Sequence, residues 1–487
     1  MNRRTLLITA LALLLCVPAT AATARTRAKK PPRITQIGCV LRCAEGTPIT
    51  VQPGGKLQLW GRGLERRMVA TFPRKSKVHR SRRRVTALVR QRGAVFSVTV
   101  PLLARSGRFT VALPGGPRSN AAGPIKIRKP APVAKPPRPT SAGDSPFDTT
   151  VMWVWYVSKS ADGTATGIGA QARAAGVGTV IIKASDGGSD FVGQFTPALV
   201  AALHAQGLKV CGYSYVYGNN PSGEAAQGAR VAQTGADCLV IDAEGEYEGK
   251  YASATTYIRA LRQAVGDSFP VGIAPFPYLD YHASFPYSVF LGPGGAQYDL
   301  PQMYWRDIGT SVDTVFDHTY TWHRIYDRPI YPLGQTYQNP PAFDLLRFRQ
   351  LAQAYGAGGV SWWSWQETTD SEWSALGQPL PPLIGFTPTQ NWPVLERGSK
   401  GDPVVWLQMH LLAAGQQVTV NGNFDTATDA AVRYLQAGAG LPVTGVTDPG
   451  TWQKALSYTP TAVDWTSQAR PARAARAPRD EIAAKPE

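Results

Sequence analysis

The chain has 487 residues, of which 43% are hydrophobic and 17% are charged. One hydrophobic core rarely organises so long a chain, and this hydrophobic content excludes disorder throughout, so we expect several folded domains. The formal net charge of +18 is uneven: residues 25–129 hold 25 Lys or Arg against 2 Asp or Glu, whereas residues 143–385 hold 13 against 22. The six histidines are scattered and no Cys–His spacing typical of zinc occurs, so we expect no metal and no cofactor.

Residues 1–24 have the three parts of a secretory signal peptide. Arg3-Arg4 precedes an apolar run from Leu6 to Val17, and small residues follow this run. An apolar run of this length is too short to span a bilayer stably. We therefore expect cleavage near Ala22 to Ala24 and a secreted mature protein. The residues do not decide between Sec and twin-arginine export.

Residues 33–128 are predicted to form a basic, all-β domain. Short runs of alternating apolar residues, such as VFSVTV, are broken by Gly-Gly and Ser-Gly turns. Cys39 and Cys43 are close enough to bridge a tight loop, which export permits. The segment PPRITQIG … GGKLQLWGRGL is similar to immunoglobulin-like domains of the IPT/TIG type, which implies an immunoglobulin-like fold.

The charge of this domain indicates its partners. Its densest cluster consists of Arg80, Arg82, Arg83 and Arg84. Such a field attracts anionic polymers, which for an exported protein means anionic wall polymers or an acidic lipid surface. Export argues against nucleic acid. The alternative is a solvated basic surface without a partner.

Residues 129–146 contain six prolines and are predicted to form a stiff linker, and residues 147–376 then alternate apolar runs with helical patterns. Eight such alternations favour a (β/α)8 barrel, in which active groups lie at the carboxyl ends of the strands. The predicted strands are Val151–Val157, Gly178–Lys183, Lys209–Tyr215, Cys238–Glu244, Pro270–Ala274, Leu300–Tyr304, Pro329–Leu333 and Gly359–Trp365. Cys211 and Cys238 fall on neighbouring strands and are either bridged or merely buried.

Two carboxylates end the fourth predicted strand, in the sequence CLVIDAEGEYEG. Asp242 and Glu244 are two residues apart, so on a strand they point to the same side. Close carboxylates raise the pKa of one of the pair, which suits a general acid at neutral pH. The alternative is a capping or salt-bridged pair. Glu246 and Glu248 follow in the loop and are expected to face solvent.

The segments GTVIIKASDGGSDF, HAQGLKVCGYSYVYG and DCLVIDAE follow one another much as in glycoside hydrolase family 25, the muramidase-type lysozymes. The resemblance implies Glu244 as proton donor to the glycosidic oxygen. It implies Asp242 as the partner that helps the developing positive charge or orients the acetamido group of the substrate. Asp148 in PFDTT matches the family's first-strand aspartate, whereas Ser214 stands where many members have His. Family 18 chitinases share the Asp-x-Glu end, but Val240 replaces their preceding aspartate.

Aromatic residues fill the remaining strand ends, where their flat faces suit the CH groups of sugar rings. We expect Tyr213, Tyr215, Tyr304, Trp305 and Trp365 to bind substrate, with Asp148 and Asp186 as polar contacts. The alternative is core packing. Alternate residues of WWSW at 362–365 point opposite ways, so at least one of these tryptophans is structural.

A second linker, residues 377–393, precedes residues 394–458, which are predicted to form three short helices. Helix starts are indicated at Asp402-Pro403, Asp425-Thr426 and Asp448-Pro449. The segments LERGSKGDPVVWLQMHL, VNGNFDTATDAAVRYLQ and GLPVTGVTDPGTWQKAL, with the pairs Leu407-Gln408 and Leu435-Gln436, resemble the peptidoglycan-binding domain 1 family. This implies cell-wall glycan or stem peptide as the ligand; the alternative is a helical spacer. Residues 459–487 hold little to bury and are predicted to be disordered.

Together these patterns predict an exported, cell-wall-associated glycan hydrolase of several domains. A (β/α)8 TIM-type barrel is flanked by an amino-terminal immunoglobulin-like β domain and a small carboxyl-terminal three-helix domain. Two alternatives stay open: a non-catalytic peptidoglycan-binding wall protein with a degenerate barrel, or a chitinase-like glycosidase of another polysaccharide. The linker between the barrel and the last helices predicts that wall docking and bond cleavage are separable.

Overall fold

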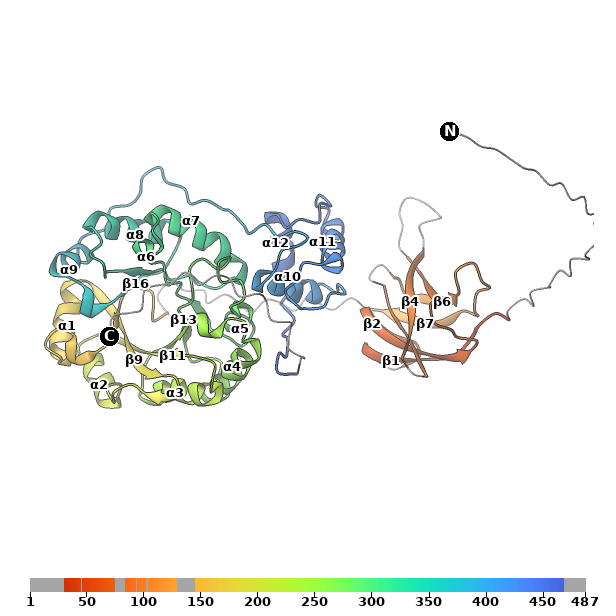
Figure 1. The fold of residues 1–487 in the computed structure, drawn as a ribbon, viewed down its shortest axis with the longest axis horizontal. Helices are drawn as coiled ribbons and strands as arrows, with labels where there is room; N and C mark the ends of the chain where they lie inside the picture. Colours follow the sequence, from red (N-terminus) through yellow and green to blue (C-terminus); the bar gives the residue numbers. More distant parts are fainter. Residues whose placement is uncertain are drawn as a thin grey trace, which may run out of the picture. The chain divides into compact units, whose positions relative to one another are not determined.

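The structure is a computed structural model that describes residues 30–44, 46–74, 84–92, 94–101, 104–128 and 145–467. The chain divides into two compact units, Met1–Arg128 and Lys129–Glu487, and each is described by itself (Figure 1). The predicted signal peptide, Arg80, Arg82 and Arg83 of the basic cluster and most of the linker 129–146 lie outside the described residues. Within the described part, no helix is long and apolar enough to cross a membrane.

The amino-terminal unit consists of β-strands, as its alternating pattern predicts. The strands are β1 (Arg33–Ala44), β2 (Ile49–Arg62), β3 (Val69–Pro73), β4 (Arg84–Arg92), β5 (Val95–Thr99), β6 (Gly107–Ala112) and β7 (Ala122–Ile127). They pair in the order β1-β2-β5-β4-β3-β6-β7, and β7 also pairs in parallel with β2, so that the sheet closes around a core. Phe72 stacks on Phe109 in this core, and Cys39 is bridged to Cys43. The all-β prediction is confirmed, whereas the IPT/TIG likeness stays a prediction.

The second unit begins with eight parallel strands that close into a barrel. They are β8 (Thr150–Val154), β9 (Val177–Asp186), β11 (Lys209–Val216), β12 (Cys238–Ala243), β13 (Val271–Ile273), β14 (Tyr298–Asp299), β15 (Leu333–Gln335) and β16 (Val360–Trp363). The short strand β10 (Ser189–Asp190) pairs antiparallel with β9. Pairing of β16 with β8, and parallel bridges from Asp299 to Ile330 and from Gln302 to Leu333, complete the ring.

The sixth and seventh strands lie at other positions than predicted. Strand β14 ends at Asp299, before the predicted range 300–304, and β15 begins at Leu333, where the predicted range 329–333 ends. Pro301 and Pro332 interrupt this part of the ring. Because proline has no backbone N–H to donate, only isolated bridges join the two strands here.

Helices cover the outside of the barrel (Figure 1), and side chains fill its inside. The helices are α1 (Ala165–Ala174), α2 (Pro197–His204), α3 (Pro221–Gln233), α4 (Tyr251–Val265), α5 (Tyr287–Phe290), α6 (Trp305–Ile308), α7 (Val312–His323), α8 (Ala342–Ala354) and α9 (Asp370–Leu376). Along β9, Val180 and Ile182 belong to the outer layer, whereas Ile181 belongs to the interior. The disulfide between Cys211 and Cys238 joins β11 to β12 within that interior. Because the barrel is filled, a ligand can enter only at its ends.

The carboxyl-terminal helices are α10 (Asp402–Ala413), α11 (Thr426–Ala439) and α12 (Pro449–Leu456). They form two similar helix–turn–helix units, one from α10 to α11 and the other from α11 to α12. In each unit, the side-chain oxygen of a buried glutamine accepts hydrogen bonds from two consecutive backbone N–H groups of the following turn. The side-chain amide of the same glutamine donates to a threonine of the next helix. The contacts are Gln408 with Asn421, Gly422 and Thr428, and Gln436 with Thr444, Gly445 and Thr451. The two Leu-Gln pairs therefore hold the turns of this fold.

The segment after α12 packs on the barrel, so the prediction of disorder from residue 459 is wrong for residues 459–467. Trp465 is buried, and its ring centroid lies 4.6 Å from that of Tyr251 in α4. Asp464 forms an ion pair with Arg259 of the same helix. Trp465 is the aromatic anchor of this segment, and an average over the composition of the segment hides it. Residues beyond 467 lie outside the described part.

Candidate functional site

Asp242 and Glu244 at the end of β12 face the same side of the strand, as the alternation predicts. The Nε2 group of Gln302 donates to Oε1 of Glu244 at 3.1 Å, to Oδ1 of Asp242 at 3.4 Å and to the backbone oxygen of Ala274 at 3.0 Å. Gln302 follows β14, two strands away in the ring. The side-chain amide of Gln302 thus links both carboxylates to the segment that follows β14, on the other side of β13.

A narrow pocket opens beside this pair at the carboxyl ends of the strands. It is a shallow depression lined by Trp153, Asp242, Ala274, Gln302, Tyr304, Leu333 and Trp363. Asp242 is buried in it, whereas Glu244 is half-buried. A ligand that reaches these carboxylates therefore lies across the mouth of the barrel.

Further polar groups form a rim around the pocket. The Tyr215 hydroxyl donates to the Glu246 carboxylate at 3.1 Å, and the Tyr217 hydroxyl donates to Asp186 at 2.7 Å. Lys183 forms an ion pair with Asp186 at 2.6 Å. Carboxylates from β9 and from the residues after β12 thus gather on one side of the mouth, with one lysine among them.

The tyrosines of the mouth are held in their neutral form. Burial raises the pKa of Tyr215 well above its ordinary range, and Glu244 and Asp242 raise it further. Burial likewise raises the pKa of Tyr304, and Tyr337 and Asp242 add to the effect. Both phenols therefore keep their protons at physiological pH. The Tyr215 hydroxyl donates its proton to Glu246, whereas the Tyr304 hydroxyl can donate to a ligand.

Of the predicted substrate-binding residues, Asp186, Tyr215 and Tyr304 do lie at the mouth, together with the carboxylate pair. Tyr213 does not reach it. Its side chain is 1% exposed, and its ring centroid lies 4.9 Å from that of Trp153 and 5.9 Å from that of Trp363. Tyr213 therefore packs in the interior, beneath the pocket.

Three other predicted residues lie away from the mouth, contrary to the prediction. Asp148 precedes β8 and accepts a hydrogen bond from Tyr331, which precedes β15, so it lies at the opposite end of the barrel. Trp305 is buried outside the barrel, and its Nε1 donates to Asp344 of α8 at 3.0 Å. Trp365 follows β16 in a short 3-10 helix, and its ring packs on Trp373 of α9.

The site also contains residues, Trp153 among them, that are not among those predicted from the sequence. Gln302 contacts both carboxylates, and Trp363 lines the pocket. The alternation within WWSW predicts that at least one tryptophan is structural; Trp362 packs in the outer layer, whereas Trp363 lines the pocket. Gln302 lies two residues before Tyr304, a spacing that puts both on one face of an extended chain. Among the described residues, no group of three or more His, Cys, Asp or Glu side chains is arranged to hold a metal ion.

We expect Gln302→Leu to slow turnover about tenfold, because the substitution removes the donor that orients both carboxylates and leaves their oxygens without that bond. Gln335 provides the matched control. It is a buried glutamine of β15 whose side chain contacts the backbone of Arg306 and Tyr337 instead of the carboxylates. Initial rates on soluble wall fragments compare the two variants. Equal losses in Gln302→Leu and Gln335→Leu would indicate a general packing defect.

The carboxyl-terminal helices are packed on the barrel by a buried aspartate. Asp402 is the first residue of α10 and does not cap it, contrary to the prediction from Asp402-Pro403, since Gly401 is the N-cap. Its carboxylate instead accepts hydrogen bonds from Tyr251 at 2.8 Å, from the hydroxyl and backbone N–H of Ser288 at 2.6 and 2.8 Å, and from Tyr326 at 2.6 Å. All of these donors belong to the barrel. Beside them, the Trp406 indole N–H donates to the backbone oxygen of Ile325 at 2.6 Å.

This interface makes stability depend on pH. Burial raises the pKa of the Asp402 carboxyl to about 6, although the hydroxyl donors act against the rise. The folded state therefore holds this proton more tightly than the unfolded state. The stabilisation is full below about pH 4 and is lost as pH rises through about 6.

Between pH 4 and 6, we expect the free energy of unfolding to fall more steeply with pH for the parent than for Asp402→Asn. The difference in slope corresponds to the one proton that the folded parent holds at Asp402. Urea unfolding at a series of pH values measures the two slopes. Asp464→Asn is the control, because Asp464 is exposed and its pKa is lowered by Thr466. If the parent and Asp402→Asn have the same slope, the proton is not held at Asp402.

Comparisons with known proteins address the two parts of this unit. Residues 400–455 match the family model described as "Putative peptidoglycan binding domain", which confirms the resemblance of the last helices to that family. A comparison with curated proteins finds no match.

Several solved structures are similar to the chain at low identity. A chitinase from Chromobacterium violaceum ATCC 12472 is 14% identical, with a TM-score of 0.36, over 47% of this chain and 98% of the other. "Putative Chitinase A" from Streptomyces coelicolor is 15% identical, with a TM-score of 0.35, over 48% and 98%. The modular autolysin LytC from Streptococcus pneumoniae is 9% identical, with a TM-score of 0.25, over 46% and 62%. The barrel itself is defined by the strand order and register given above.

Proposed function

We propose that this chain is an exported hydrolase of cell-wall glycan, of the muramidase type, that docks on peptidoglycan through its last helices. The observation that carries the proposal is the Asp242–Glu244 pair at the carboxyl end of β12, held by Gln302 beside an aromatic pocket. The match of residues 400–455 to a peptidoglycan-binding family, within the same compact unit, supports the choice of substrate.

Each carboxylate has a role that follows from its surroundings. Glu244 is half-buried at the rim, where a glycosidic oxygen can reach it, and serves as the proton donor. Asp242 is buried beside the pocket and either stabilises the positive charge that develops on the sugar or orients the acetamido group of the substrate. Tyr304 donates a hydrogen bond from the rim, and the Tyr215 hydroxyl, which donates to Glu246, can accept one.

Mass spectrometry of muropeptides tests this proposal, after incubation of the purified chain with sacculi. New reducing-end muramic acid is the expected product. Reducing-end glucosamine would instead assign a different glycosidic bond. If no product forms, the barrel is a non-catalytic wall-binding scaffold, and the proposed hydrolysis is wrong.

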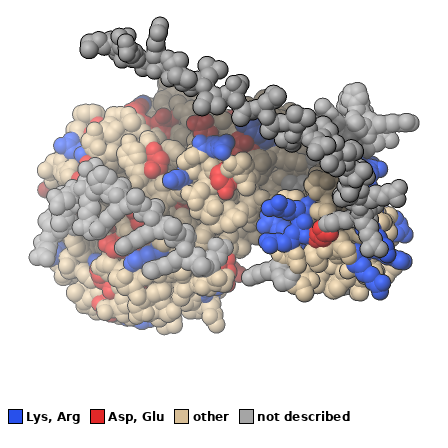
Figure 2. All heavy atoms as spheres, turned by 45° about the vertical axis from the view of Figure 1, so that its right-hand side comes forward, with Lys and Arg blue, Asp and Glu red and all other residues tan. Residues whose placement is uncertain are grey.

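The amino-terminal unit is proposed to hold an anionic polymer or acidic lipid surface. Within its described residues, Glu65 is the one acidic side chain, whereas basic residues such as Arg84 and Arg90 of β4 are exposed. Figure 2 shows Lys and Arg side chains spread over this unit. A field of one sign attracts polymers of the opposite sign.

We expect wall binding of the full chain to weaken steeply as salt rises, because exposed charges are screened over about 8 Å at physiological ionic strength. Deletion of residues 25–129 should remove the salt-sensitive part, since these residues carry the excess of positive charge. Co-sedimentation with sacculi between low and high salt measures both. A profile that does not change with salt in the full chain would favour a solvated basic surface without a partner.

A further inference from the structure

Helices α10 and α11 are corresponding parts of two similar units. Gln408 and Gln436 make the same contacts, so a residue of α10 corresponds to the residue of α11 that lies 28 positions later. The turn glycines agree with this correspondence. A Cβ added to Gly422 would lie 3.2 Å from Val405, and one added to Gly445 would lie 2.6 Å from Arg433, which is the corresponding residue.

The two helices present corresponding surfaces to different surroundings. In α10, Asp402 and Trp406 are buried against the barrel. The corresponding residues of α11 are Ala430, which is exposed, and Tyr434, which is half-buried. The position that fixes α10 to the barrel thus stays accessible to solvent in α11.

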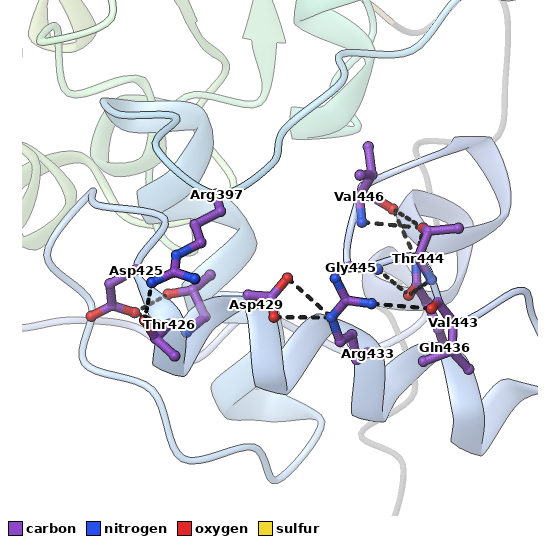
Figure 3. Close-up of polar contacts among 11 residues, drawn as sticks. Arg397, Asp425, Thr426, Asp429, Arg433, Gln436, Val443, Thr444, Gly445 and Val446 are labelled. Atoms are coloured by element: carbon purple, nitrogen blue, oxygen red, sulfur yellow. Dashed lines mark hydrogen bonds and ion pairs between the residues drawn. The ribbon is translucent and has the colours of Figure 1, made fainter.

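This accessible side of α11 carries an organised guanidinium group (Figure 3). The Nε group of Arg433 donates to Oδ2 of Asp429 at 2.9 Å, and Nη1 donates to the backbone oxygen of Val443 at 3.2 Å. The Arg433 side chain is still 45% exposed. Arg397 donates to Thr426 at the start of the same helix, and Figure 3 shows Asp429 between the two arginines.

Helix stability alone does not explain this arrangement. An exposed pair four residues apart on a helix contributes only about 0.3–0.5 kcal/mol. The additional bond to Val443 and the close fit of Gly445 against Arg433 hold the guanidinium in one orientation. Asp429 occupies Nε and Val443 occupies one hydrogen of Nη1, which leaves Nη2 and the other hydrogen of Nη1 to bind a carboxylate. A guanidinium that is already oriented loses less conformational entropy on binding.

We propose that the α11 surface, defined as Arg397, Arg433 and Val443, binds a carboxylate of the peptidoglycan stem peptide, with Asp429 orienting Arg433. Val443 is 51% exposed and packs on an apolar side chain next to that carboxylate. This proposal rests on the proposed docking of the last helices on peptidoglycan and names the surface that performs it. It does not depend on catalysis by the barrel.

The test measures co-sedimentation of the full chain with purified sacculi, in the background of Glu244→Gln so that the wall stays intact. We expect Arg397→Ala combined with Arg433→Ala to weaken the affinity at least tenfold, and Arg433→Lys alone to weaken it less. The charge-matched control is Lys400→Ala combined with Lys454→Ala, because Lys400 is exposed and the Lys454 ammonium lies over the ring of Tyr458 in the same helical domain. This control should bind like the parent. Unchanged binding of the arginine variant would overturn the proposal.

A second arm tests the chemistry of the ligand. Sacculi whose carboxylates have been converted to neutral amides should bind the parent and the double arginine variant equally. The amino-terminal unit contributes equally to both proteins, so it does not affect this comparison. If the variant keeps its full defect on amidated sacculi, the α11 surface does not bind a carboxylate. Turnover of soluble fragments by the chain with Glu244 intact is measured separately, so a failure of the hydrolase proposal is distinguishable from a failure of this one.

Discussion

Glu244→Gln should lower turnover on soluble wall fragments at least a hundredfold. The amide keeps the size of the carboxyl and can still contact Gln302, but it has no proton to give to the leaving oxygen. General acid catalysis typically contributes about 10²–10⁴ in rate. Release of reducing ends from soluble fragments, followed over time with the purified variant, measures the loss. Unfolding should be unchanged, because the residue is half-buried and lies at the rim.

Glu246→Gln is the matched control for this experiment. Glu246 lies two residues further along, is exposed, and accepts a hydrogen bond from Tyr215. Its loss should slow turnover only a few-fold, because it orients a tyrosine and is not placed to donate a proton beside the pocket. A Glu244→Gln variant that digests soluble fragments as fast as the parent would refute the assignment of the proton donor. An equal loss in both variants would mean that turnover depends equally on both rim carboxylates and does not single out Glu244 as the proton donor.

The sequence predicts the parts of this site that depend on local periodicity. Asp242 and Glu244 share one side of a strand because side chains alternate there, and the structure places both against Gln302. The same alternation predicts that at least one tryptophan of WWSW is structural, and Trp362 does pack in the outer layer. Strand β16 ends at Trp363, and the 3-10 helix that follows turns Trp365 outward, so the parity of the strand does not extend to it.

Other parts of the site depend on contacts between distant segments, which periodicity does not encode. Gln302 follows a strand of two residues, which is too short to show an alternating pattern. Its role depends on its contact with Glu244 at the end of β12, two strands away in the ring. The family resemblance predicts Asp148 as a first-strand aspartate of the site. Asp148 precedes β8 and therefore lies at the amino end of the barrel strands. Asp402 is of a residue type that commonly caps helices, and only the tertiary structure shows that its partners are Tyr251, Ser288 and Tyr326.

Trp406→Ala should destabilise the second unit by about 3–5 kcal/mol, the usual range for a buried tryptophan. The side chain is 3% exposed, its ring centroid lies 5.2 Å from that of Tyr326, and its N–H donates to the backbone oxygen of Ile325. Its removal leaves a cavity between α10 and the barrel and leaves that oxygen without its partner. Urea unfolding of the full chain, followed by circular dichroism, measures the change. Ile384→Ala is the control, because that side chain is 96% exposed and should change stability little.

This result would also decide whether docking and cleavage are separable. The linker at 377–393 predicts separate domains, but Asp402 and Trp406 join the last helices to the barrel through buried contacts. We therefore expect the barrel and these helices to unfold in one transition, and deletion of residues 394–467 to impair cleavage of soluble fragments as well as of sacculi. The loss on soluble fragments would then arise from exposure of the barrel surface that these helices cover. If Trp406→Ala loosens the helices while the barrel keeps its stability and its rate on soluble fragments, the two parts act independently and the interface only sets their orientation.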